Sequence, residues 1–276
     1  MTRRVFVASS MFATASLLSA IFVLAAMFAA ATLVSAQERM EPLHGTCSIT
    51  ASEHADKVRL NMERVPCEGD GHCGTTDSDV PLAEWTGFTL SDLGREGAHL
   101  DAAMTAEAGT LGCSGTVHES ALRGDYTFTP NPEFVTRMQQ IGISDFDSEK
   151  LQAYTMFHIE TAWVQALQSA GVRDMDSGNV IALHIFRITP EFVHSMDALG
   201  YPHLEADKLI AFGVQGVNAD EVKEVRALGY QPTADELIQM RIFHVTPDFI
   251  RRMQDRGFKD LTIAKLVQVR IFRLAE

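Results

Sequence analysis

The chain has 276 residues, of which 46% are hydrophobic and 21% are charged, so it is long enough for two globular domains and is not intrinsically disordered. The first 36 residues contain Arg3 and Arg4 but no acidic residue, which leaves 21 basic and 36 acidic residues in the remainder, a formal charge of -15. Because such a surface repels phosphate groups, this balance argues against binding of nucleic acids or of anionic lipid headgroups.

The N-terminus has the pattern of an export signal. Two arginines precede an apolar stretch over residues 11–33, and the small residues Val34, Ser35 and Ala36 follow it. We predict a signal peptide over residues 1–36, cleaved after Ala36. The apolar stretch is also long enough to cross a bilayer, so an uncleaved membrane anchor is the alternative. Both alternatives place the rest of the chain outside the cytoplasm, in the periplasm or outside the cell.

Four cysteines fall in the first half of the exported chain. An even number of cysteines in an oxidising compartment indicates two disulfides, and four cysteines allow three pairings. Cys67 and Cys73 flank a glycine-containing loop and can close on each other, which leaves Cys47 to pair with Cys113. None of the spacings is the two-residue spacing of a zinc knuckle, so a metal site is the weaker alternative.

Apolar and polar residues alternate in two segments of the N-terminal half, 56–65 and 100–128. A period of two is typical of strands with one buried face. Ala108-Gly109 and residues 120–124 supply turns, so we expect an antiparallel meander of three short strands over the second segment and a further strand over the first. Residues 37–130 are therefore predicted to form a small antiparallel β domain stapled by disulfides.

From residue 131 onward the chain repeats with a period of about 29 residues. Five glycines mark the repeat, separated by 29, 29, 29 and 28 residues: Gly142, Gly171, Gly200, Gly229 and Gly257. Eleven residues before each glycine stands a residue that we expect at a helix N-terminus: Asn131, Glu160, Thr189, Asn218 and Thr246. Each glycine is expected to end its helix in the left-handed backbone conformation.

A second helix is predicted in every repeat. The expected N-terminal residues of these helices are Asp147, Asp176, Glu205, Thr233 and Thr262. Neither helix can bury its apolar stripe alone, so consecutive repeats have to stack. We therefore predict an α+β protein in which the β domain precedes an α-solenoid of five helix-turn-helix repeats over 131–276. The repeats span 131–159, 160–188, 189–217, 218–245 and 246–276.

The repeat resembles one found in known proteins. The residues that carry the resemblance are Thr189-Pro190-Glu191-Phe192-Val193, Leu199-Gly200-Tyr201 and Leu209-Ile210-Ala211. They are similar to tandem repeats of exported bacterial proteins of unassigned function. The same repeats are appended to membrane zinc metallopeptidases of the β-lactamase-sensor type. The likeness covers residues 100–276 and implies a helical array, but it implies no activity.

Nothing in the sequence requires an enzyme. The metallopeptidases need His-Glu-x-x-His, whereas His118-Glu119 has no second histidine after it, so peptidase activity is not carried over. His158 and His244 share one repeat position, which would suit a metal. In the other repeats that position holds Arg187, Gly216 and Arg273, which favours a helix C-terminus. We predict no catalytic residue, no metal and no cofactor; enzymatic activity is left undecided, with its absence favoured.

Four phenylalanines share one position in the second helices. They are Phe157, Phe186, Phe243 and Phe272, with Gln215 in the third repeat. One interpretation is burial between repeats, and the other is a partly exposed row that binds an extended peptide or a partner helix. As further contacts we group four polar residues expected on the surface: Arg137, His194, Lys223 and Arg251.

Polar residues interrupt the apolar side of the second helices two positions before these phenylalanines. They are Thr155, His184, Gly213, Arg241 and Arg270, and nothing in the sequence explains them.

The sequence as a whole predicts a non-catalytic interaction or scaffold protein that is secreted or lies in the cell envelope, with a protein or peptide as its partner. The alternatives are a hydrolase or accessory domain with a site in the β domain that involves Cys73 or His118, and a sensor anchored by residues 11–33.

Overall fold

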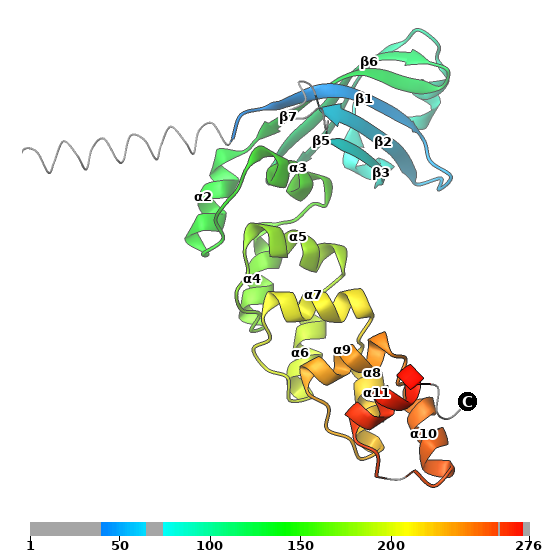
Figure 1. Ribbon diagram of the computed structural model, residues 1–276. Coiled ribbons are helices and arrows are strands. Elements are labelled where there is room, and N and C mark those ends of the chain that lie inside the picture. The colour runs from blue at the N-terminus through cyan, green and yellow to red at the C-terminus, as the bar shows by residue number, and fades with distance from the viewer. Residues whose placement is uncertain (1–39, 65–73, 259, 273–276) are drawn as a thin grey trace, which may run out of the picture. The chain divides into compact units, whose positions relative to one another are not determined.

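The computed structural model describes residues 40–64, 74–258 and 260–272 (Figure 1). Within this part of the chain seven strands, with two short 3-10 helices (Leu82–Glu84 and Leu90–Gly94) among them, precede ten α-helices, so the predicted α+β class is confirmed. The predicted signal segment, Cys67 and Cys73 lie outside the described residues. All of these strands and helices belong to one compact unit, Pro42–Glu276. Among the described residues, none of the helices combines the length and the hydrophobicity needed to cross a bilayer.

The strands form one antiparallel sheet in the order β3-β2-β1-β7-β6-β5-β4. Their bounds are β1 (Leu43–Ala51), β2 (Lys57–Arg64), β3 (Thr75–Pro81), β4 (Trp85–Thr86), β5 (His99–Ala106), β6 (Gly109–His118) and β7 (Ala121–Pro130). The strand predicted over 56–65 is β2, and the predicted meander is β5, β6 and β7. Alternation alone does not indicate β1, β3 or β4, because β1 and β3 carry few large apolar residues and β4 has only two residues.

A disulfide between Cys47 and Cys113 crosses the middle of the sheet. It is one of the two disulfides predicted together from the sequence. Cys47 lies on β1 and Cys113 on β6, with β7 running between these two strands. Strands separated by a third strand are normally about 9.5 Å apart. The α-carbons of the two cysteines are only 6.0 Å apart, within the range that a disulfide requires. The sheet is therefore sharply curled about β7 at this point (Figure 1).

Three glycines allow neighbouring strands to approach closely, and two of them, Gly115 and Gly124, lie at this curl. Gly45 lies on β1, Gly115 on β6 and Gly124 on β7, and the last two are directly paired. A β-carbon at any of the three would lie 2.0 to 2.1 Å from a backbone carbonyl oxygen of the neighbouring strand. Because no side chain fits in that space, the curl depends on residues that lack a β-carbon.

Ten helices follow, two for each predicted repeat. The first helices are α2 (Pro132–Gln140), α4 (Thr161–Ser169), α6 (Pro190–Ala198), α8 (Ala219–Ala227) and α10 (Pro247–Asp255). The second helices are α3 (Ser148–Met156), α5 (Ser177–Ile185), α7 (Ala206–Gln215), α9 (Ala234–Ile242) and α11 (Ile263–Phe272). Every first helix follows its predicted N-cap residue. The five predicted glycines all have left-handed backbones, with φ from 77° to 97°, so both signals are confirmed.

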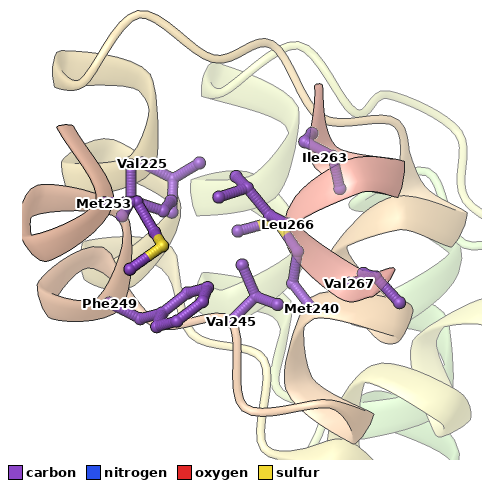
Figure 2. Close-up of a cluster of buried hydrophobic side chains, with 9 residues drawn as sticks. Val225, Met240, Val245, Phe249, Met253, Ile263, Leu266 and Val267 are labelled. Carbon is purple, nitrogen blue, oxygen red and sulfur yellow. The ribbon is translucent and has the colours of Figure 1, made fainter. Parts of the chain in front are cut away.

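The helices lie in two rows. Each first helix contacts the first helix of the next hairpin, from α2 to α10, and each second helix contacts the next second helix, from α3 to α11 (Figure 1). Three clusters of buried apolar side chains combine residues of consecutive hairpins. In the last of them, Val225 and Met240 meet Phe249 and Leu266 of the following hairpin (Figure 2). Consecutive hairpins therefore share a core.

Polar side chains also join each hairpin to the one before it. On the second helices, Arg241 Nε donates to the carbonyl of Gln215 at 2.9 Å, and Arg270 Nε donates to the carbonyl of His244 at 3.1 Å. On the first helices, Gln168 Nε2 donates to the carbonyl of Ile141 at 2.8 Å. Gln254 likewise donates to the carbonyl of Leu228, at 3.3 Å. The carbonyl groups at the end of a helix have no hydrogen-bond donor within that helix. In these four cases a side chain of the next hairpin supplies the donor.

These contacts explain the polar position that the sequence leaves open. Arg241 and Arg270 occupy it in the last two hairpins and bind the preceding helix end. His184 packs there between Phe157 and Trp163, with ring centroids 6.1 and 5.2 Å away. At Gly213 a β-carbon would lie 2.6 Å from the β-carbon of Phe186, so a side chain would clash. Thr155, in the first hairpin, is instead buried and donates to the carbonyl of Leu151 in its own helix at 3.0 Å, so the contact with a preceding hairpin is a feature of the later hairpins.

Glu107, in the turn between β5 and β6, joins the sheet to the helices. Its carboxylate accepts hydrogen bonds from the backbone N–H and the hydroxyl of Thr161, at 3.2 and 2.7 Å, and lies 3.5 Å from Arg137 of α2. Partial burial opposes ionisation, but the hydrogen bonds from Thr161 and the charge on Arg137 outweigh it and lower the pKa of Glu107. The sheet thus caps α4, whose own N-cap residue Glu160 makes no side-chain hydrogen bond.

We expect Glu107→Gln to lower the free energy of unfolding by about 1 kcal/mol at pH 7, as for a lost helix cap. Because the pKa of Glu107 in the folded protein lies below its ordinary value of 4.5, its stabilisation is present above that value and is lost as the pH falls through the folded pKa. Urea denaturation should separate the two proteins at pH 7, and the difference should shrink as the pH is lowered below 4.5. An equal difference at both pH values would show that the charge on Glu107 contributes nothing.

We expect the double substitution Cys47→Ala with Cys113→Ala to lower the free energy of unfolding by about 3–5 kcal/mol, because the disulfide closes a long loop of the unfolded chain. The two cysteines are 66 positions apart. Denaturation without reductant measures the change, and Ser114→Ala, on the exposed side of β6, is the matched control that should differ little. A double variant as stable as the unmodified protein would contradict the account of the curled sheet.

Candidate functional site

A line of exposed apolar side chains runs over the C-terminal ends of the second helices. We call it the apolar ridge, and its members are Phe157, Ile185, Phe186, Val214, Ile242, Ile271 and Phe272. Their exposed fractions run from 37% at Phe157 to 67% at Phe272. Single exposed apolar residues are ordinary, but a contiguous series is typical of an interaction surface.

Contacts between consecutive helix ends place the ridge residues of neighbouring hairpins near one another. The ring of Phe157 packs against His184, which directly precedes the ridge residue Ile185. Phe186 lies against Gly213, which directly precedes Val214. Farther along, Arg241 and Arg270 each bind a carbonyl at the end of the preceding hairpin. Each helix end therefore adjoins the next, and the apolar side chains follow one another along the second row.

The four predicted phenylalanines differ in their surroundings. Phe157, Phe186 and Phe272 belong to the ridge. Phe243 is only partly exposed and packs against the core that the last two hairpins share. A more regular apolar position, not predicted as a contact, lies directly before the phenylalanines and is occupied by Met156, Ile185, Val214, Ile242 and Ile271. Its apolar residues recur in every repeat, but the sequence pattern of an exposed apolar position is the same as that of a buried one.

A cavity of about 540 Å³ opens beside the first ridge residue, between α3 and the strands β1, β2, β3 and β7. Its apolar lining residues are Leu43, Met62, Tyr126, Met156 and Phe157. Thr76, Ser78 and Gln152 supply hydroxyl and amide groups. Because apolar and polar side chains both line it, the cavity can hold a small molecule or the side chains of a peptide.

Charges at the cavity are paired. Arg64 of β2 forms an ion pair with Glu149 of α3. Asp77 of β3 lies 2.8 Å from Arg59, measured between Oδ1 and Nε. Burial raises the pKa of Tyr126, so its hydroxyl stays protonated at neutral pH. The cavity therefore suits apolar groups with neutral hydrogen-bonding groups better than it suits an ion.

The four polar residues predicted as contacts do not meet the ridge. Arg137, His194, Lys223 and Arg251 lie on the first helices α2, α6, α8 and α10, whereas the ridge follows the ends of the second helices. Three of them are in ion pairs. Arg137 lies 3.5 Å from Glu107, Lys223 lies 2.9 Å from Asp220, and Arg251 lies 2.7 Å from Asp248 and 3.1 Å from Glu224. The structure thus brings Phe157, Phe186 and Phe272 into one line, places Phe243 against the core and leaves the polar residues apart from the line.

The shared position of His158 and His244 lies just after a helix C-terminus. Both residues have left-handed backbones, with φ of 50° and 53°, as do Arg187 at 56° and Gly216 at 66°. These values agree with the helix-terminus interpretation, and Arg273 lies outside the described residues. Within the described ranges, no three His, Cys, Asp or Glu side chains lie close enough to hold a metal ion.

The residues of the alternative hydrolase hypothesis give no assembled site in the described structure. His118 lies at the exposed turn between β6 and β7, where its Nδ1 is 2.8 Å from Glu96. Cys73, the other residue of that hypothesis, lies outside the described residues. Comparisons of the chain with protein-family models, curated proteins and solved structures found no match. The resemblance to the repeats of exported bacterial proteins therefore stays a prediction.

We expect Arg187→Gly and His244→Gly each to raise the free energy of unfolding by about 0.5–1 kcal/mol, because glycine adopts the left-handed backbone without steric cost. The reverse change, Gly216→Ala, should lower it by about 1 kcal/mol. Urea denaturation measures all three variants. A loss of stability in His244→Gly, together with stabilisation of the unmodified protein by added zinc, would instead indicate a metal ligand.

Proposed function

We propose that this protein is a non-catalytic interaction protein in which an α-solenoid of five hairpin repeats binds an extended peptide segment of a partner in the cell envelope. The apolar ridge is the observation that carries the proposal. Its side chains recur at two adjacent positions of successive second helices and remain exposed. Keeping such a line in water is unfavourable, and burial against a partner removes that cost.

The contacts between hairpins support the solenoid. Consecutive hairpins share apolar cores, and donors of one hairpin bind carbonyl groups of the one before it. In an array of this kind, equivalent surface positions recur at the spacing of packed helices, about 8–10 Å. The ridge therefore offers an apolar contact at regular intervals along the row.

This spacing favours one conformation of the bound peptide. A polyproline II segment advances about 3.1 Å per residue and has three residues per turn, so every third side chain points the same way at intervals of about 9 Å. We propose a partner segment with an apolar residue at every third position, each residue meeting one hairpin. The cavity beside Phe157 supports a larger apolar anchor at one end, where Thr76, Ser78 and Gln152 can bond to peptide groups.

The disulfide in the sheet supports a location of the protein outside the cytoplasm. The disulfide between Cys47 and Cys113 suits an oxidising compartment. The N-terminal sequence pattern narrows this proposal to export with cleavage after Ala36, into the periplasm or out of the cell. The resemblance of the repeats to those of exported bacterial proteins supports the same placement.

Two polar substitutions on the ridge test the proposal. The probe is a synthetic peptide of five Leu-Ser-Pro triplets, titrated into the exported chain and followed by calorimetry. We expect Ile185→Gln with Ile242→Gln to weaken binding at least tenfold, because each buried isoleucine contributes about 1.5–3 kcal/mol. Helicity should stay unchanged, since these side chains are 49% and 47% exposed.

The matched control is His194→Gln with Lys223→Gln, two exposed positions on the first row. This pair should leave the affinity for the peptide unchanged. Failure of the unmodified chain to bind the probe, or equal binding by the ridge variant, would contradict the proposed function.

A further inference from the structure

Arginines accompany the apolar ridge from one hairpin to the next. The C-terminal parts of the second helices and the residues that end them contain three arginines and no Asp or Glu over 151–158, 180–187, 209–216, 237–244 and 266–272. The rest of residues 37–276 contains 18 Lys and Arg against 36 Asp and Glu. The ends of the second helices are therefore locally basic in a chain that is acidic elsewhere.

The first of these arginines, Arg187, lies at the contact between α5 and α7. In the chain it stands between the ridge residue Phe186 and Ile188. A β-carbon on Gly213 of α7 would lie 3.2 Å from the carbonyl oxygen of Phe186 and 3.3 Å from Cδ1 of Ile188, so this segment packs against α7. Gly213 directly precedes the ridge residue Val214. The backbone of Arg187 is therefore close to ridge residues of both helices.

The other two arginines lie at the next two contacts between second helices. Arg241 directly precedes the ridge residue Ile242, and its Nε donates to the carbonyl of Gln215 on α7 at 2.9 Å. Arg270 of α11 donates in the same way to the carbonyl of His244, just after α9, at 3.1 Å. Three successive contacts between second helices therefore each place one arginine beside the ridge.

The positive charge of two of these arginines is not balanced within the described structure. Arg241 forms a partly buried ion pair with Glu221 at 2.6 Å. Arg187 is exposed, and the guanidinium of Arg270 lies 4.1 Å from the ring centroid of Phe249. Neither Arg187 nor Arg270 forms an ion pair with a described residue. The helix dipole favours a cation at a helix C-terminus, but it leaves an exposed guanidinium able to bind a carboxylate of a partner.

Carboxylates at the start of the first helices are paired within those helices. Asp220 lies 2.9 Å from Lys223 in α8, and Asp248 lies 2.7 Å from Arg251 in α10. These acidic residues therefore balance cations of the first row and not the arginines beside the ridge.

We propose that the partner segment bound by the ridge is acidic, with a carboxylate beside each apolar residue of its three-residue repeat. This inference rests on the proposed peptide-binding function and adds the charge of the residues between the apolar ones. Successive arginines belong to successive hairpins, so they recur at the same spacing as the ridge residues. One turn of a polyproline II segment, about 9 Å, brings one apolar residue and one carboxylate to each hairpin.

An anionic membrane is a poorer occupant of this surface. Basic and apolar side chains together also suit a bilayer that contains anionic lipids. A bilayer extends beyond the ridge, however, and would meet the rest of the exported chain, whose formal charge is -15. A single extended segment meets the ridge alone and avoids this repulsion.

Two synthetic peptides that differ only in charge test this proposal. One has five Leu-Glu-Pro triplets and the other has five Leu-Gln-Pro triplets, and each is titrated into the exported chain by calorimetry at low ionic strength. We expect the acidic peptide to bind about tenfold more tightly, as for two ion pairs formed at an exposed surface. The ratio of the two affinities should fall at high salt, because salt screens exposed charges.

Substitution of Arg187 assigns this preference to the ridge. Arg187→Gln should lower the ratio of the two affinities about threefold, and Arg187→Lys, which keeps the charge, should retain most of it. General damage to the ridge would weaken both peptides equally and leave the ratio unchanged. The matched control is Arg252→Gln on α10, an exposed position of the first row that removes the same charge and should not change the ratio.

The outcomes distinguish this proposal from the proposed function. If neither peptide binds, the peptide-binding function fails and this proposal fails with it. If both bind equally, or if the ratio is unchanged in Arg187→Gln, the peptide-binding function stands and the acidic partner is wrong. Binding to phosphatidylglycerol vesicles that Arg187→Gln abolishes would also overturn the proposal, because the surface would then meet a membrane.

Discussion

The contact between consecutive hairpins has an apolar part and a polar part, and the helical rows depend on both. Helices of nine or ten residues are too short to be stable alone in water. Their apolar sides are buried only where two hairpins meet, as Leu183 and Leu209 do, and the carbonyl groups at helix ends receive donors such as Arg241 from the next hairpin. Because this contact occupies the sides of every inner hairpin, those sides are closed to a partner, whereas apolar side chains at the ends of the second helices stay exposed.

The sheet contacts the first hairpin of the helical rows through α3. Its curl about β7 depends on glycines such as Gly124, which leave room for the close approach of Cys47 and Cys113 across β7. The cavity beside the ridge lies between strands of this sheet and α3. Glu107 then links the turn between β5 and β6 to the N-terminus of α4. The sheet therefore stabilises the first hairpins and also forms part of the candidate binding surface.

Features that depend on local chemistry could be predicted from the sequence. The glycines with positive φ and N-caps such as Thr233, which forms a capping box with Glu236, are set by neighbouring residues. Features that depend on distant partners could not. Arg241 has its partner 26 residues earlier, β3 is a polar edge strand without alternation, and the exposure of Ile185 cannot be told from an apolar pattern that suits a core equally well.

Hydrogen exchange on Leu237→Ala tests the shared contact most directly. Leu237 of α9 lies in the core between the third and fourth hairpins, with Met196 and Tyr201. We expect amide protection to fall together in α8, α9, α10 and α11, whereas the sheet and α2 to α5 keep theirs, because each hairpin depends on its neighbours. An equal loss of protection in the sheet and in all ten described helices would contradict it, since the chain would then open as one unit.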